Sequence, residues 1–219
     1  MIINNKCVLP SIKKIKGSYI NLEKISEKDI DELYTCFTNT DNSSWDYLPY
    51  GPFENKEDFS SFVTNTFIAR DPCMYCVRDN ITNEAIGVIG LMQIKIEHRS
   101  IEVGHVHFGD KLKGTIGATE SVFLLLQHSF SLGYRRFEWK CNNENEKSKK
   151  SALRLGFIAE GVFRQHMIVK GKNRDTAWFS MLDSEWIFIE NEFIRWLSPS
   201  NFDEKGIQKT KLNMLVNNA

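Results

Sequence analysis

Apolar residues recur at helical spacing soon after the start of the chain. Ile30, Leu33 and Phe37 lie three or four positions apart and share one face of a helix. Ser26 is followed three residues later by Asp29, which is the spacing of a capping box with Asp in place of the usual Glu. The pattern therefore predicts a helix that begins at Ser26 and ends near Phe37.

A second helix is predicted over residues 54–69, where Phe59, Phe62 and Phe67 fall on one face. Residues 38–52 separate the two helices. They are rich in Asn, Asp and Ser and end in Gly51-Pro52, so we expect a loop there.

Strand patterns precede and follow the two helices. Residues 19–22 predict one short strand, and residues 74–78, 85–96 and 101–108 predict three more, separated by turn-forming residues. Because the connections between the last three are short, we expect an antiparallel meander.

The third strand of this meander carries a charged residue among apolar ones. Strict alternation places one set of side chains on one face and a second set on the other: Glu102, Gly104, Val106 and Phe108 against Ile101, Val103, His105 and His107. A carboxylate on an apolar, central strand is expected to have a raised pKa. Glu102 is therefore a candidate general base, and an ordinary ion pair with Lys or Arg is the alternative.

The remaining pattern continues to alternate between helices and strands. Gly133 and Gly156 follow two helical patterns at the position of a C-cap, and Ser198-Pro199 ends a third. The predicted elements are a helix over 115–132, a strand over 134–141, a helix over 144–155, strands over 157–169 and 174–183, and an amphipathic helix that contains Trp186 and Trp196. The last twenty residues are polar, and we expect a loosely held tail. The fold class is mixed α/β.

Composition limits the possible functions. The chain has 219 residues with 28 Lys+Arg and 28 Asp+Glu, and this zero net charge argues against a DNA-binding protein. No apolar run approaches the ~18–20 residues of a membrane span, and the first 16 residues lack the apolar core of a secretory signal. We expect a cytoplasmic protein with no membrane partner.

Five cysteines do not suggest a disulfide framework. Cys73 and Cys76 have the spacing of a redox or zinc motif, but no second pair accompanies them, so buried thiols are favoured. His105 and His107 have the spacing of a metal pair, yet no third ligand stands out. No metal is expected, and the absence of Gly-x-Ser-x-Gly argues against a serine hydrolase.

The segment from Gly109 to Thr115 leads directly from a strand into a helix. The first amides of a helix have no intrahelical acceptor and the helix dipole is positive there, so this segment is a candidate anion cradle. An ordinary strand-to-helix turn is the alternative. Gly109 and Gly114 have P-loop spacing, but Thr115-Ile116 replaces the required Lys-Ser/Thr.

Several motifs together resemble the GNAT N-acetyltransferases, in particular the Rim-type branch that acetylates ribosomal-protein N-termini. They occur in the family's order: Ala118-Thr119-Glu120, Asn145-x-x-Ser148, Leu155-Gly156-Phe157, Glu160-Gly161, Arg174-Asp175 and Glu185-Trp186. The resemblance covers residues 18–197. It implies a lead-in over 1–17, a GNAT domain over 18–184 with a mostly antiparallel sheet, a splayed strand pair and helices on both faces, and a C-terminal helix and tail over 185–219.

The resemblance implies acetyl-CoA as co-substrate and a primary amine as acceptor. Coenzyme A is expected between the strands 101–108 and 134–141. Its expected contacts are Val106, His107 and Phe108 on the first strand, Lys111, Gly114, Thr115, Ile116, Gly117, Ala118 and Thr119 in the cradle, and Asn145 and Ser148 near the thiol. Ile116 departs from the family, which has a small residue at that position.

Catalytic roles follow from the same resemblance. Glu102 matches the strand position proposed for the general base, and Ser148 matches the residue proposed to protonate the leaving thiolate. A helix N-cap is the alternative role for Ser148. Residues 140–175 contain nine basic and four acidic residues, an excess of five charges that suits an anionic coenzyme or, alternatively, a solvated surface.

The acceptor is the least determined part of the prediction. Trp45, Tyr47 and Tyr50 lie in the loop that lines the acceptor groove in this family, and we expect them to contact the substrate or to pack the loop down. The expected activity is N-acetylation of a protein N-terminus by direct transfer in a ternary complex, in a monomer or homodimer. The alternatives are a small amine or aminoacyl-nucleotide antibiotic as acceptor, a CoA-binding module without activity, and a scaffold protein.

Overall fold

The computed structural model describes residues 6–38, 42–69, 73–204 and 206–212. Its centre is an eight-stranded sheet in the order β1-β2-β3-β4-β5-β6-β8-β7. The strands are β1 (Lys14–Lys16), β2 (Ile20–Lys24), β3 (Cys73–Asp79), β4 (Ala85–Lys95), β5 (Ser100–Phe108), β6 (Arg136–Asn142), β7 (Ile158–Val169) and β8 (Lys172–Leu182). Only β5 and β6 pair in parallel, so the predicted mixed, mostly antiparallel sheet is confirmed.

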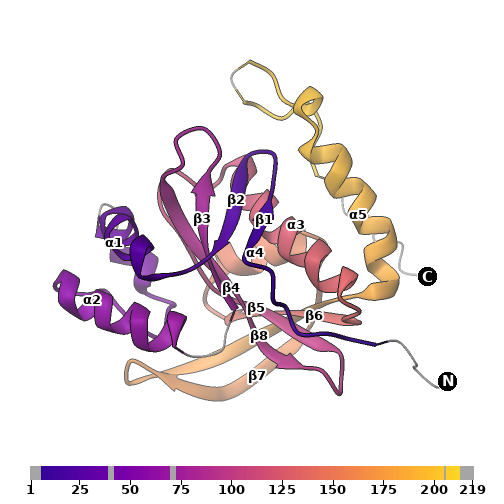
Figure 1. Ribbon diagram of the computed structural model, residues 1–219. Helices are drawn as coiled ribbons and strands as arrows, with labels where there is room; N and C mark the ends of the chain where they lie inside the picture. Colours follow the sequence, from indigo (N-terminus) through magenta and orange to yellow (C-terminus); the bar gives the residue numbers. More distant parts are fainter. Residues whose placement is uncertain (1–5, 39–41, 70–72, 205, 213–219) are drawn as a thin grey trace.

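Helices cover both faces of this sheet (Figure 1). On one face lie α1 (Ile30–Thr38) and α2 (Lys56–Phe62), which continues as a π-helical turn over Val63–Ile68. The other face carries α3 (Ile116–Ser131) and α4 (Glu146–Arg154), and the C-terminal helix α5 (Asp183–Leu197) packs outside α3. Three short 3-10 turns complete the fold, at Glu27–Asp29, Asn42–Trp45 and Pro199–Asn201.

The two helical layers enclose separate hydrophobic cores. Phe37, Phe59 and Phe67 pack with Met74 and Val88 beneath α1 and α2. The larger core lies on the α3 side and includes Ile101, Val103, Leu125, Phe137 and Phe193. Each core matches an apolar stripe that the sequence predicts.

Local signals end the elements where the sequence predicts. The Asp29 carboxylate accepts hydrogen bonds from the Ser26 backbone N–H and hydroxyl at 2.9 and 2.8 Å, as a capping box requires. Gly133 and Gly156 follow α3 and α4 with φ of 91° each, a conformation that favours glycine.

Two features at the ends of the chain differ from the sequence-based expectation, whereas the favoured interpretation of Cys73 and Cys76 as buried thiols is confirmed. Lys14–Lys16 forms a strand antiparallel to β2, although its three residues are too short for a visible pattern. Residues 199–204 and 206–212 are not a loose tail, because the Asn201 side chain is buried and donates to the carbonyls of Trp196 and Thr210. Cys73 and Cys76 lie in different cores because they are three positions apart on a strand, so they cannot form one site.

All five cysteines are free thiols, and Cys73, Cys76 and Cys141 are buried. In the part of the chain that the structure describes, no helix is both long and apolar enough to cross a membrane. Over the same residues, His, Cys, Asp and Glu side chains form no group of three that is suited to a metal ion.

Candidate active site

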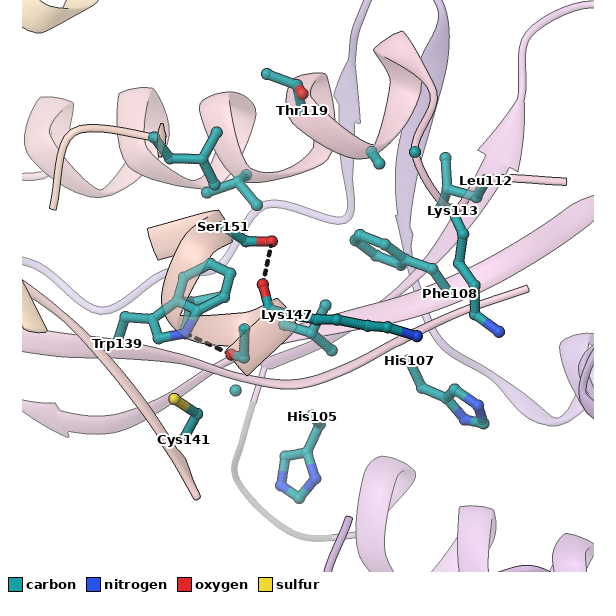
Figure 2. Close-up of a pocket in the computed structure, with 18 of the residues that line it drawn as sticks. His105, His107, Phe108, Leu112, Lys113, Thr119, Trp139, Cys141, Lys147 and Ser151 are labelled. Carbon is teal, nitrogen blue, oxygen red and sulfur yellow. Dashed lines mark hydrogen bonds between the residues drawn. The ribbon is translucent and has the colours of Figure 1, made fainter. Parts of the chain in front are cut away.

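The site begins where two neighbouring strands separate. β5 and β6 pair in parallel only from Ser100 and Arg136 to Val103 and Trp139. Beyond that point β5 continues to Phe108 and β6 to Asn142 without pairing to each other. The opening between them belongs to a cavity of about 2100 Å³, and Figure 2 shows it between β5, β6 and α4. The splayed strand pair is confirmed.

A β-bulge in β5 changes which side chains face each core. Gly104 pairs with Gly90 and His107 pairs with Val88, so His105 and Val106 together oppose one residue of β4. His105 takes up the extra residue with φ of 52°. Bulges are common beside active sites because they redirect side chains.

The strict alternation predicted for this strand is therefore wrong beyond Gly104. Val106 and Phe108 pack into the α3-side core together with Ile101 and Val103. His105 and His107 lie on the opposite face: the His105 ring stacks on Tyr50 and the His107 ring on Phe37. Burial lowers the pKa of His107 to about 3, so both the packing and the charge state indicate a neutral ring.

The segment before α3 has the geometry of an anion cradle. Gly114 has φ of 73°, and nothing lies within 4 Å of the position that a Cβ would take. Thr115 is the N-cap, and its hydroxyl accepts from the Ala118 N–H at 3.4 Å. The amides of Ile116 and Gly117 have no intrahelical acceptor at this helix start. These two amides are therefore the candidate donors to an anion at this helix start.

The predicted cradle residues all line the same cavity. They are Lys111, Gly114, Thr115, Ile116, Gly117, Ala118 and Thr119. The Ile116 side chain packs against the α3-side core, so its departure from the family pattern does not fill the cradle. The Lys111 ammonium already forms an ion pair with Glu84.

The structure also explains the Ala118-Thr119-Glu120 motif. The Glu120 side chain is buried, and its carboxylate accepts hydrogen bonds from the backbone N–H groups of Ser18, Tyr19 and Ile20 at 2.6 to 2.9 Å. Glu120 thus ties α3 to the start of β2. This role is structural and holds the cradle against the sheet.

Glu102 lies in the cavity wall on the α1/α2 face of β5. The residue is 6% exposed, and its Oε2 accepts a hydrogen bond from the Lys140 ammonium at 2.6 Å. Burial raises the pKa of the Glu102 carboxyl, and the Lys140 hydrogen bond partly opposes that rise. The ion pair that the sequence left as the alternative is thus present, and the raised pKa is the property expected of a general base.

Ser148 reaches the cavity from the other face of the sheet. Its hydroxyl oxygen accepts a hydrogen bond from the Trp139 indole N–H at 3.0 Å, drawn as a dashed line in Figure 2. An indole only donates, so this bond does not use the Ser148 O–H proton, and the Cys141 sulfur lies within hydrogen-bonding reach of the same hydroxyl. The N-cap of α4 is Asn145, whose Oδ1 accepts from the Ser148 N–H at 3.0 Å, so Ser148 is not the cap.

Of the three aromatic residues predicted for the acceptor, only Tyr47 lines the cavity. Trp45 is 5% exposed and packs edge-on against Phe37 and His107. Tyr50 packs against other rings beside His105, and burial raises the pKa of its hydroxyl. Trp45 and Tyr50 therefore pack the loop down, which is the alternative that the sequence left open.

The basic segment over residues 140–175 divides into two parts. Lys140, Lys147, Arg154 and Arg174 line the cavity, whereas the remaining cations lie outside its wall. Arg154 donates to the Thr119 hydroxyl at 3.1 Å and lies over the Trp196 ring. Part of the positive charge of this segment therefore lies in the cavity wall.

Sequence reasoning missed three residues of this site: Trp139, Lys140 and Arg174. A signal existed for Trp139 and Lys140, because charged and apolar residues alternate from Arg136 to Cys141 and mark a strand with one polar face. Arg174 belongs to the Arg174-Asp175 motif of the resemblance, but no local pattern indicates that its side chain lines the cavity.

Comparisons with known proteins agree with this geometry. The family model described as "Acetyltransferase (GNAT) domain" matches residues 20–158, more than half of the chain. A solved GCN5-related N-acetyltransferase from Brucella melitensis is 38% identical, with a TM-score of 0.92, over 96% of this chain and 97% of that one.

Two curated relatives extend the comparison. The "Uncharacterized N-acetyltransferase YoaA" of Bacillus subtilis (strain 168) is 28% identical over 74% of this chain and 92% of its own length. The "Ribosomal-protein-serine acetyltransferase" of Escherichia coli (strain K12) is 33% identical over 38% of this chain and 46% of its own length. This distant similarity agrees with a Rim-like branch. The fold, the cavity and these matches show that the chain belongs to the GNAT family and is an acetyl-CoA-dependent N-acetyltransferase.

Proposed function

We propose that this protein acetylates the α-amino group of a peptide or protein N-terminus by direct transfer from acetyl-CoA, with Glu102 as general base and Ser148 as general acid. The observation that carries the proposal is the placement of these two groups. Glu102 lines the cavity from the α1/α2 face, and Ser148 lines it from the α3/α4 face, on either side of the gap between β5 and β6. A proton acceptor and a proton donor thus flank one reaction centre.

The residues around the cavity fit acetyl-CoA. The amides of Ile116 and Gly117 would hold its pyrophosphate, because they have no intrahelical acceptor at this helix start and Gly114 leaves open space where a side chain would stand. Acetyl-CoA supplies the activated acetyl group. The β5 edge from Val106 to Phe108, which β6 leaves uncovered, offers backbone N–H groups that would polarise a carbonyl.

The proton transfers follow from the hydrogen bonds of the two side chains. A protonated amine cannot attack, so the Glu102 carboxylate takes its proton, and the raised pKa strengthens this base. The Ser148 hydroxyl then donates its proton at Oγ to the departing sulfur. Trp139 orients that hydroxyl by donating to Oγ.

A direct transfer is favoured over an acyl-enzyme by the state of the cavity thiol. Cys141 lines the cavity beside Ser148, and burial raises the pKa of its thiol. A thiol with a raised pKa is a poor nucleophile, because the thiolate is the reactive form. Cys141 therefore does not compete with the acceptor amine.

A peptide acceptor is supported by the similarity to the ribosomal-protein-serine acetyltransferase. A cytoplasmic location is supported by the five free thiols, which suit a reducing compartment. The open cradle and the buried Glu102 disfavour a CoA-binding module without activity.

The test is acetyl-CoA turnover with a panel of peptides that differ in their first residue and a panel of small amines. We expect peptides to be acetylated, and Glu102→Gln to lower kcat by roughly 100-fold or more. Glu97→Gln, an exposed carboxylate at the β4–β5 turn, is the matched control and should keep the wild-type rate.

Two results would contradict the proposal. A wild-type rate in Glu102→Gln would exclude Glu102 as the base. A rise in melting temperature with acetyl-CoA but no turnover of any amine would indicate a binding module instead.

A further inference from the structure

Arg174 lies on the acceptor side of the cavity, in β8. Alternate residues of this strand, Ala177 and Phe179, pack into the α3-side core. Arg174 and Trp178 therefore share the opposite face, and both line the cavity. Glu102 lies on the same face of the sheet.

The guanidinium of Arg174 has no partner in the described protein. The other buried or half-buried arginines that the structure describes all have one: Arg78 with Asp29, Arg99 with the Gly133 carbonyl, and Arg136 with Glu160. For Arg174 the structure shows no hydrogen bond and no ion pair among these residues, and its Nε is buried without an acceptor. A half-buried cation without a partner is costly, so its presence needs a reason.

A second orphaned donor lies four residues along the same face. The Trp178 indole nitrogen is also buried without an acceptor. Arginine and tryptophan side chains only donate hydrogen bonds, so the partner that is missing is an acceptor. Because one of the two donors is a permanent cation, an anionic acceptor is the matching group.

The neighbouring cation cannot take this role. The Lys140 ammonium lies 3.8 Å above the Trp178 ring and is bound by Glu102 at 2.6 Å and Glu138 at 3.5 Å. Glu102, Lys140 and Arg174 line the cavity here, and because the Glu102 carboxylate binds Lys140, Arg174 is the cation left without an ion pair among the described residues.

We propose that the acceptor carries a carboxylate close to its reactive amine and that Arg174 binds this carboxylate while the amine lies near Glu102. The inference rests on the proposed N-acetyltransferase function and names the acceptor class for it. Two sources of this chemistry exist: an acidic side chain near the start of a peptide, and the α-carboxylate of a free amino acid.

Matched acceptors separate these sources. One pair is a peptide with Glu at the second position and the same peptide with Gln. The other pair is a free amino acid and its amide. For each pair, kcat/KM is measured at saturating acetyl-CoA for the wild type, Arg174→Gln and Arg174→Lys.

We expect the wild type to prefer the charged member of at least one pair by roughly 10- to 100-fold, the range of a hydrogen bond to a charged group. Arg174→Gln should abolish this preference and leave the uncharged member unaffected, and Arg174→Lys should retain part of it. The control is Arg164→Gln, which removes an exposed cation from the adjacent strand β7 and should keep the wild-type preference.

Arg174→Gln should unfold at the same temperature as the wild type or higher, because the guanidinium has no partner to lose. The inference is overturned if the wild type shows no charge preference in either pair, or if Arg174→Gln slows both members of a pair equally. Equal slowing would mean that Arg174 acts on Glu102 rather than on the acceptor.

Binding of the same pairs to Glu102→Gln, measured by calorimetry, keeps the inference apart from the proposed function. If the wild type acetylates none of these acceptors, the proposed function fails. The carboxylate site would still be supported if the charged member of a pair binds more tightly than the uncharged member and if adding Arg174→Gln removes this difference. Equal binding of both members would overturn it.

Discussion

Replacing Lys140 with Met should move the pH dependence of the reaction. The change removes the hydrogen bond at 2.6 Å that holds down the pKa of Glu102 and leaves the burial that raises it. A hydrogen bond to a charged group contributes ~1.5–3 kcal/mol. The pKa of the Glu102 carboxyl should therefore rise, because its ionised form loses this stabilisation.

Glu102 must be ionised to take a proton, so the acidic limb of kcat/KM should shift to higher pH. The assay is thiol release from acetyl-CoA between about pH 5 and 9. Lys140→Arg keeps the charge and should leave the limb near its wild-type position. The control Lys14→Met removes an ion pair between Lys14 on β1 and Glu23 on β2, and it should leave the acidic limb unchanged. An unmoved limb in Lys140→Met would refute the assignment of Glu102 as the titrating base.

The same variant has a predicted effect on stability. A carboxyl pKa that is raised in the folded state favours folding at low pH, and this contribution is lost as the pH rises through the folded pKa. Removing Lys140 raises the pKa of Glu102 further. The melting temperature of Lys140→Met should therefore fall further below the wild type at pH 8 than at pH 4.5. If the melting temperature of Lys140→Met falls by the same amount at pH 8 and at pH 4.5, the pKa of Glu102 does not differ between the variant and the wild type.

Three further substitutions test single contacts. Trp139→Phe removes the indole N–H that donates to Ser148, so kcat should fall about tenfold with an unchanged KM for acetyl-CoA; an unchanged kcat would show that Ser148 needs no such donor. Glu120→Gln replaces a carboxylate that accepts three backbone N–H groups, and urea unfolding should show a loss of about 2 kcal/mol, whereas a loss near zero would contradict the tie to β2. Asp29→Asn leaves the buried Arg78 short of a charge partner and should cost about 3 kcal/mol in the same measurement, with normal activity per folded molecule; reduced activity in the folded variant would argue against a purely structural pair.

Much of the fold could be predicted from local signals. The helix α3 ends before Gly133 because its left-handed φ favours glycine, and Thr115 begins it because its hydroxyl accepts from a free amide. Short connections dictate the antiparallel meander β3-β4-β5, since parallel strands need long crossovers. The cradle from Gly114 to Ala118 follows from the same local rules.

The site itself depends on contacts that no local pattern reports. The bulge at His105 arises from its pairing with β4, and it turns His105 and His107 away from the face that alternation predicts. Trp45 is buried and Tyr50 half-buried because both rings pack against other aromatic rings, and the sequence left open whether they contact the substrate or pack the loop down.

The sequence by itself determined the order of the elements, their caps and the two apolar faces, because these depend on residues a few positions apart. Only the tertiary structure decided that Lys140 binds Glu102 across two strands and that the buried Arg174 Nε has no hydrogen-bond acceptor among the described residues. Both outcomes depend on strand order and register, which bring residues 38 and more positions apart to one face of the sheet. The charge state and the selectivity of the cavity are therefore properties of the folded sheet.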